Sequence, residues 1–300
     1  MFFLAIFKLN KIFYNIAAFW LELFYYLTTI HYFCSMFQKI IKISIAVLLF
    51  AGIATSCQYD KLLKSTNYKL KYNKAVEYYK AEEYTKAVGL FEQLNPVLKA
   101  TDRADTVLYY LSNSYFEQEN YILAEHHYQQ FYETFGNHEW AEEAEFRSAY
   151  CNYELSPRPA LDQGYTKKAI NKLNLFITRH PNHPKVAESH RLIQELTDKL
   201  AIKAYKSARL YYDMEDYKAA VVALENALKR FPNTTHRKEL KYMILKSRFL
   251  LASNSVKSKE QERYQNTLDA YYTFTSEYPD SEYSKEVQEI FNVTQRNLQN

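Results

Sequence analysis

The amino-acid sequence predicts an all-α protein made of repeated helical hairpins, and three observations support this fold class. The chain contains only 4 glycines and 7 prolines in 300 residues, whereas β-sandwiches need many turns and dinucleotide-binding folds need glycine-rich loops. One spacing of tyrosine, alanine and larger apolar residues returns several times along the chain. Proline or glycine, next to asparagine or aspartate, follows the later copies and ends each helix there.

The repeated spacing is Tyr-x-x-Ala, then an aromatic residue or leucine four positions on, then another apolar residue three positions on. Steps of three and four residues place these side chains on one face of an α-helix. Three copies are close: Tyr84, Ala87, Phe91, Leu94; Tyr121, Ala124, Tyr128, Phe131; and Tyr217, Ala220, Leu224, Ala227. Two copies are looser: Ala169, Leu173, Phe176; and Tyr264, Tyr271, Phe274.

A partner helix is expected before each close copy. A small residue lies twelve positions before the repeat alanine and a tyrosine nine positions before it, in the pairs Ala75 and Tyr78, Ser112 and Tyr115, and Ala208 and Tyr211. This pattern resembles the tetratricopeptide repeat, a helix–turn–helix unit. The resemblance implies a right-handed α-solenoid of about five hairpins over residues 66–298, stacked around a continuous core with a concave surface.

The connections between helices differ along the chain. The third and fifth units carry longer segments near 156–164 and 253–259, which are either loops or short helix extensions. No helix breaker occurs between Pro184 and Glu215, so we expect one long helix there. A smaller break near 181–184 would divide the repeat domain into two halves.

An N-terminal targeting segment is predicted from Met36 onward. Lys39 and Lys42 precede an apolar run over 43–54, which is shorter than the roughly 20 residues of a spanning helix and is typical of a signal peptide. Small residues then lead to Cys57, a pattern that resembles the lipobox of bacterial lipoproteins. We therefore expect a signal peptide over 36–56, lipidation of Cys57 and a lipidated linker over 57–65. The alternative is an uncleaved anchor followed by an ordinary cysteine.

Residues 1–35 are aromatic and apolar but precede what is already a complete signal peptide. We interpret them as an over-extended gene start that is not part of the native protein. The alternative is a membrane helix over about 13–34, which Glu22 in its middle disfavours.

Composition and motifs exclude several functions. Residues 1–56 hold four basic residues and one acidic residue, so residues 57–300 carry a net charge of only +1, unlike a nucleic-acid-binding domain. Cys151 is expected to be a small buried residue without a disulfide. His180, His183 and His190 lack the ligand number of a zinc site. No catalytic motif is present, so we expect no enzyme activity, metal or cofactor apart from the lipid.

These features together resemble the outer-membrane assembly lipoprotein family BamD (YfiO). The resemblance rests on the signal peptide, the lipobox, five hairpins and repeat ends of the form Phe/Tyr-Pro-Asn/Asp, and covers residues 57–300. It implies an outer-membrane lipoprotein facing the periplasm. Its implied partners are a homologue of the β-barrel insertase BamA and unfolded outer-membrane proteins.

The resemblance also implies partner-binding residues. Asp198-Lys199-Leu200-Ala201 looks like a family segment Asp-Arg-Leu-Ala, whose arginine pairs with an acid of the insertase. Lys199 keeps the charge but loses the bidentate fork, and the alternative is a solvated surface charge. For clients, we predict an aromatic site for an extended peptide, with Lys71, Lys74 or Arg103 near its carboxylate. Its tyrosines are those outside the repeat pattern: Tyr72, Tyr79, Tyr109 and Tyr110. Alternatively, these rings pack between hairpins.

Two other functions remain open at this point. One is a different tetratricopeptide lipoprotein that acts as a periplasm-facing adaptor of the cell envelope. The other is a lipoprotein that binds a small ligand or glycan on stacked tyrosines.

Overall fold

The computed structural model describes residues 58–299, which divide into two compact units after Asn73. The expectations for residues 1–35, for the signal peptide and for Cys57 lie outside the described residues. Among the described residues, no helix combines the length and the apolar character needed to cross a membrane.

The described part of the first unit is short. Residues 58–64 are helical, and α2 (Tyr68–Lys80) begins after a brief turn. The Asn67 side chain accepts a hydrogen bond from the Leu70 amide at 3.0 Å, which satisfies a donor at the start of α2. The Lys71 ammonium is buried and donates to the Leu63 carbonyl at 2.9 Å. This contact fastens α2 to the preceding helical segment.

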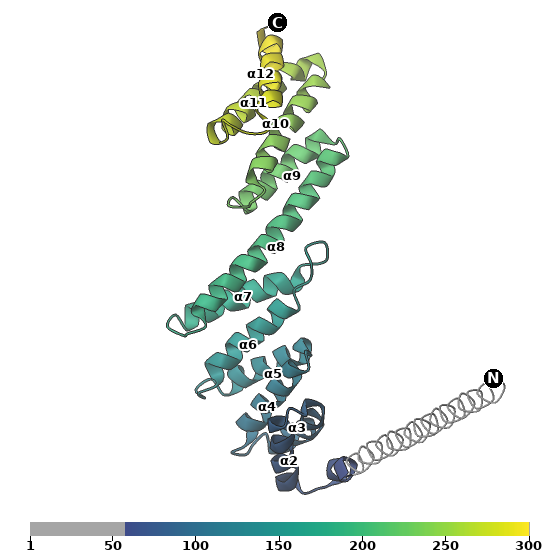
Figure 1. The fold of residues 1–300 in the computed structure, drawn as a ribbon, viewed down its shortest axis with the longest axis vertical. Helices are drawn as coiled ribbons and strands as arrows, with labels where there is room; N and C mark the ends of the chain where they lie inside the picture. The colour runs from purple at the N-terminus through teal and green to yellow at the C-terminus, as the bar shows by residue number, and fades with distance from the viewer. Residues whose placement is uncertain (1–57, 300) are drawn as a thin grey trace, which may run out of the picture. The chain divides into compact units, whose positions relative to one another are not determined.

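The second unit is all-helical over its described residues (Figure 1). After the end of α2 it contains α3 (Tyr84–Leu98), α4 (Ala104–Glu117), α5 (Tyr121–Thr134), α6 (Ala141–Glu154), α7 (Gly164–Arg179), α8 (Val186–Asp213), α9 (Tyr217–Arg230), α10 (Arg237–Ser253), α11 (Lys257–Glu277) and α12 (Ser284–Gln299). From α3 onward each helix packs mainly on its neighbours in the chain. The predicted fold class, an α-solenoid of tetratricopeptide-type hairpins, is confirmed.

The repeat alanines bring the two helices of each hairpin together. Ala87, Ala124, Ala169 and Ala220 are all fully buried, as are the small residues Ala75 and Ser112 of the partner helices. A side chain of one or two heavy atoms lets two helix backbones approach closely. The larger members of the pattern, such as Phe91, Tyr128 and Phe176, fill the space on either side. The spacing therefore identified the core correctly.

Three hairpins have the same type of tight turn between their two helices, although none of these turns contains a glycine. Glu82, Glu119 and Glu215 adopt positive φ values of 61°, 57° and 62°. In each turn the next amide bonds back to a tyrosine carbonyl of the first helix, at 2.9 Å for the Tyr78 and Tyr115 carbonyls and 3.1 Å for that of Tyr211. This is the left-handed C-terminal cap that usually selects glycine. The three glutamates therefore hold a strained backbone conformation.

The two longer connections have different outcomes. Between α6 and α7, residues 155–163 form a true loop. Between α10 and α11 only residues 254–256 lie outside helices, because Lys257–Lys259 begin α11. The 253–259 segment is thus chiefly a helix extension.

The predicted long helix is confirmed as α8, which has 28 residues. Its first half contributes Leu192 and Leu196 to a core with α6 and α7. Its second half contributes Tyr205 and Ala208 to a core with helices α9 to α12. Figure 1 shows α7 beside the first half of α8 and α9 beside the second half. The change from one core to the next therefore lies within α8, not at the predicted break near 181–184.

Candidate partner-binding surfaces

Three of the four predicted tyrosines lie together in one row of stacked rings. Tyr79 of α2 stacks on Tyr110 of α4, with ring centroids 4.6 Å apart and planes 14° apart. Trp140, just before α6, stacks on Tyr110 at 6.2 Å and on Tyr109 at 4.6 Å. We call Tyr79, Tyr110, Trp140 and Tyr109 the aromatic row. Its three tyrosines are each half-buried, so the rings contact both the hairpins and solvent.

Buried hydrogen bonds fix the position of the aromatic row. Asn113, which is 6% exposed, donates to the Tyr79 hydroxyl at 3.3 Å and accepts from the buried Tyr128 hydroxyl at 2.5 Å. Burial raises the pKa of Tyr79 and of Tyr109. Both hydroxyls therefore stay protonated at neutral pH and can donate or accept hydrogen bonds.

Tyr109 also has a structural task that repeats along the chain. It lies three residues before the buried Ser112. An aromatic residue stands at the same position, three residues before a buried small or apolar residue, in α6, α8 and α10: Phe146, Tyr205 and Tyr242. In each case the residue just before the first helix of the next hairpin covers the ring. Trp140 stacks on Tyr109 at 4.6 Å, His236 on Tyr205 at 4.0 Å, Tyr283 on Tyr242 at 3.9 Å, and the Lys185 ammonium lies 5.1 Å from the Phe146 ring. Tyr109 thus belongs to the repeat, contrary to the expectation that it is surplus.

The other predicted client-site residues have different surroundings. Tyr72 occupies the same repeat position as Tyr109, three residues before Ala75, but it lies in the first unit and is partly exposed. Lys71 is buried, and Lys74 pairs with Glu77 at 2.7 Å. Tyr110, by contrast, does not stand at a repeated aromatic position. The matching residues of α6, α8 and α10 are Arg147, Lys206 and Met243.

Trp140 was missed by reasoning from the sequence. A signal was present, because each later repeat end carries an aromatic residue, a histidine or a lysine at the same distance, five residues after Phe135, His180, Phe231 and Tyr278. These residues lie outside the helix-face pattern, so a search for helical periodicity does not find them.

Lys199 points at its own chain. Its ammonium donates to the Ser156 carbonyl at 3.1 Å and to the Ser156 hydroxyl at 2.8 Å. Burial lowers the pKa of this ammonium. Gln163, which is 3% exposed, braces the same loop by donating to the Arg158 and Leu161 carbonyls at 3.0 Å each. Lys199 therefore holds the 155–163 loop on α8, and a partner acid would have to share or replace these contacts.

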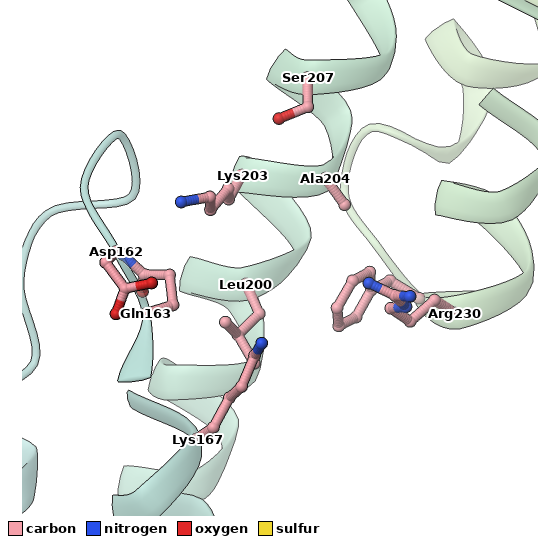
Figure 2. Close-up of a pocket in the computed structure, with 9 residues that line it drawn as sticks. Asp162, Gln163, Lys167, Leu200, Lys203, Ala204, Ser207 and Arg230 are labelled. Atoms are coloured by element: carbon pink, nitrogen blue, oxygen red, sulfur yellow. The ribbon is translucent and has the colours of Figure 1, made fainter. Parts of the chain in front are cut away.

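A pocket of about 530 Å³ lies beside this loop, between α8 and the end of α9 (Figure 2). Lys167, Lys203 and Arg230 surround it, with Asp162 as its one carboxylate. Leu200, Ala204 and the Phe231 ring supply apolar surface. Lys203 also donates to the Leu161 carbonyl, which positions its ammonium next to the loop. The pocket is therefore amphipathic, with a net positive charge.

The described residues offer little to a metal or a nucleophile. No group of three or more potential ligands there could hold a metal ion. His180 and His183 face carboxylates instead: His180 Nε2 lies 2.9 Å from Glu145, and His183 Nε2 lies 4.0 Å from Glu142. Cys151 is fully buried, as expected, and burial raises the pKa of its thiol to about 12. A thiol with this pKa is a poor nucleophile at neutral pH.

The fold and these surfaces define a class of protein, a tetratricopeptide-type helical repeat that presents aromatic and basic surfaces. Comparison with protein families makes the identification more specific. The family model described as outer membrane lipoprotein, YfiO, matches residues 65–261 and 211–298. The chain belongs to this family of outer membrane lipoproteins.

Comparison with solved structures also gives matches. A tetratricopeptide repeat protein from Bacteroides fragilis is 12% identical and matches 77% of this chain and 99% of its own, with a TM-score of 0.39. One from Parabacteroides merdae is 14% identical and matches 75% and 99%, with a TM-score of 0.33. The TPR2AB domain of yeast Sti1, solved as a complex with pHSP90, is 15% identical and matches 76% of this chain and 98% of its own, with a TM-score of 0.34. No curated protein sequence gives a match.

Proposed function

We propose that this chain is a non-catalytic scaffold lipoprotein of the machinery that assembles β-barrel proteins in the outer membrane. The observation that carries the proposal is the YfiO family match, which spans nearly all described residues, 65–298. An array of helical hairpins suits this task because it presents extended surfaces to several partners at once.

The proposed anchor is a lipid on Cys57. The small residues before this cysteine and the short apolar segment before them support lipidation. More than one acyl chain gives stable membrane attachment. The repeat domain would then stand on the periplasmic face of the outer membrane, with residues 57–65 as its tether.

The proposed client site is the aromatic row. Unfolded outer-membrane proteins expose strands in which apolar residues alternate with polar ones, with aromatic residues near the strand ends. Half-buried tyrosine and tryptophan rings can stack on such side chains at low entropic cost, because the Tyr79–Tyr110 and Tyr109–Trp140 contacts already fix their orientation. Tyr72 and the cations Lys71, Lys74 and Arg103 are further candidates for contact with a client.

The proposed contact with the insertase lies on α8. Lys199 stands where the family resemblance places an arginine that pairs with an insertase acid, and Asp198 beside it is exposed. The Lys199 ammonium donates to the single residue Ser156, at two oxygens. An ammonium has three donors, so an acid of the partner could accept the third hydrogen while the loop stays in place.

A mild-detergent pull-down from native membranes tests this proposal. Mass spectrometry would identify both the partners and the modified N-terminus of the purified chain. We expect a β-barrel insertase in stoichiometric amount and a lipidated Cys57 as the first residue. A chain that begins before Met36 without lipid, and no insertase, would contradict the proposal and would favour another envelope adaptor.

A further inference from the structure

The pocket beside Lys203 continues into a groove between α8 and α9. A second cavity, of about 170 Å³, shares Ala204, Ser207 and Arg230 with the first. Its remaining lining residues are Ala208 and Tyr211 of α8 and Ala223, Asn226 and Ala227 of α9. These residues recur every three or four positions along both helices, so the two cavities form one groove along the second half of α8.

Comparison with α4 shows that this groove occupies a place where the repeat normally has a helix. Aligning Ser112 of α4 with Ala208 of α8 pairs Leu108 with Ala204, Leu111 with Ser207 and Tyr115 with Tyr211. The three residues of α4 are 3%, 1% and 4% exposed.

The α4 positions are covered because α3, the second helix of the preceding hairpin, packs on α4. In α8 the corresponding helix, α7, packs beside the first half of the helix (Figure 1). Tyr211 is consequently 44% exposed and Ser207 is exposed. Met214 just after α8 and Val222 on α9 extend the same open surface, with exposures of 66% and 57%. Large apolar side chains left open over a floor of small residues mark an interaction surface.

Charge defines the kind of helix that would fit. Lys167, Lys203 and Arg230 approach one end of the groove, against the single carboxylate of Asp162 (Figure 2). In the covered repeat, the Tyr115 hydroxyl donates to Glu92 of α3. In that repeat the covering helix α3 thus supplies an acid to the tyrosine, and Tyr211 offers the same hydroxyl at the matching position of α8.

We propose that the groove between α8 and α9 receives an amphipathic helix of a partner protein, with acidic residues at the end that lies against Lys167, Lys203 and Arg230. The stretch from Leu200 to Met214 would accommodate about four helical turns, or roughly 21 Å. Small residues on the floor allow the incoming helix to approach closely, and its apolar stripe covers Tyr211, Met214 and Val222. This inference rests on the proposed scaffold role, because it names the chemistry of one partner segment.

The test uses two synthetic probes and the full mature chain. The acidic probe is a helical peptide of about 16 residues with a leucine stripe and glutamates in one terminal turn. The basic probe is identical except for lysines in place of those glutamates. We expect the acidic probe to bind about tenfold more tightly than the basic probe at low salt, as measured by fluorescence anisotropy. Equal affinity for the two probes would overturn the charge assignment.

Matched variants test the location. S207W places a large ring in the groove from an exposed position and should abolish binding of the acidic probe, whereas K206W, one residue along the same exposed helix surface, should not. K203E combined with R230E should reverse the preference between the probes, whereas K206E combined with K229E should leave the order unchanged. Binding that survives S207W, or that K206W removes equally, would overturn the proposal. Circular dichroism checks that all variants keep their helical content.

Two further readings separate the alternatives. If the groove instead joins two copies of this chain, sedimentation will show a dimer. S207W will dissociate that dimer and the acidic probe will not, and this result would contradict a partner helix. If the insertase still co-purifies while neither probe binds, this inference fails and the proposed function stands. If the acidic probe binds as predicted but no insertase co-purifies, the groove is supported and the proposed function fails.

Discussion

The helices α4 and α8 carry the same repeat pattern, but the surface of α4 is covered and that of the second half of α8 is open. In α4 the residues Leu108, Leu111 and Tyr115 are nearly inaccessible beneath α3. In α8 the matching positions are Ala204, Ser207 and Tyr211, and they line an open groove. The backbone is helical in both places, so the difference comes from side-chain size and from the length of α8.

The comparison teaches that function in this fold depends on what covers a helix. Between the first hairpins, the chain fills its own gap with rings, and Tyr79, Tyr110, Trp140 and Tyr109 stack in a row. A partner must lie on top of that row. Along the second half of α8 no described helix fills the matching space, and the proposed partner would enter it. The two regions are therefore expected to prefer different partners, an extended peptide and a helix.

The largest expected effect tests whether the two regions fold together. Leu173 belongs to the core beneath the first half of α8, and Leu224 to the core beneath the second half, and both are fully buried. We expect L173A and L224A each to lower the free energy of unfolding by about 3 kcal/mol, because each leaves a cavity. Urea unfolding followed by circular dichroism should show one transition in both variants, since α8 is continuous. Two separate transitions would show that the halves are independent.

A smaller effect is expected at the ion pair that joins α5 to α7. The Lys172 ammonium contacts Glu125 and also donates to Ser148 at 2.9 Å and Gln129 at 3.0 Å. Burial acts to raise the pKa of Glu125, but its hydrogen bonds and charge contacts with Lys172 and Lys168 outweigh this and lower it below the usual 4.5. We expect K172A to cost about 2 kcal/mol at neutral pH, less than for a fully buried pair because this pair is partly hydrated.

The same pair gives a pH dependence with a defined sign. Because the pKa of Glu125 is lower in the folded protein, its contribution to stability is present above pH 4.5 and is lost as the pH falls through the lowered value. The K172A variant should therefore lose less stability than the native protein on acidification. Parallel acid denaturation curves for the two proteins would refute this account.

Tyr109 and Tyr110 are neighbours with different expected roles. Tyr109 packs on Phe131 at 5.2 Å and beneath Trp140 at 4.6 Å, so Y109A should cost about 2 kcal/mol of stability. Tyr110 occupies a position without a repeated packing role, so Y110A should cost about 1 kcal/mol or less. It should still weaken binding of a C-terminal outer-membrane-protein peptide by about tenfold. Equal stability losses with unchanged peptide affinity would place both tyrosines in packing alone.

The smallest expected effect concerns the tight turns. Glu119 holds a φ of 57° at an exposed position, so E119G should raise the free energy of unfolding by about 0.5–1 kcal/mol. The matched change E289G, at an exposed position inside α12, should lower it by about 1 kcal/mol. If E119G is as destabilising as E289G, the turn is not strained.

The repeat itself could be predicted from sequence because burial follows helical spacing. The spacing of Ala87, Ala124 and Ala220 predicted the close helix contacts. The lack of a helix breaker after Pro184 predicted the long helix α8. The turn glutamates could not be predicted, since the left-handed conformation usually selects glycine and Glu119 carries no such signal.

The surfaces were predicted less well than the fold. Tyr79 and Tyr110 stack on each other, but their partner Trp140 enters from a loop, outside any helical period. The hydrogen bonds of Lys199 to Ser156 depend on how the 155–163 loop folds back, which spacing does not encode. The groove exists because, among the described helices, α7 packs beside the first half of α8 and does not cover the second half, which a spacing pattern does not reveal.

One measurement tests the central claim that the two surfaces are separate. The affinities of the C-terminal outer-membrane-protein peptide and of the acidic helical probe are measured for the native chain, for Y79A combined with Y110A, and for S207W. The account predicts that the tyrosine variant weakens only the extended peptide and that S207W weakens only the helical probe, each by about tenfold or more. If either variant weakens both ligands alike, or if neither variant affects its own ligand, the account is contradicted.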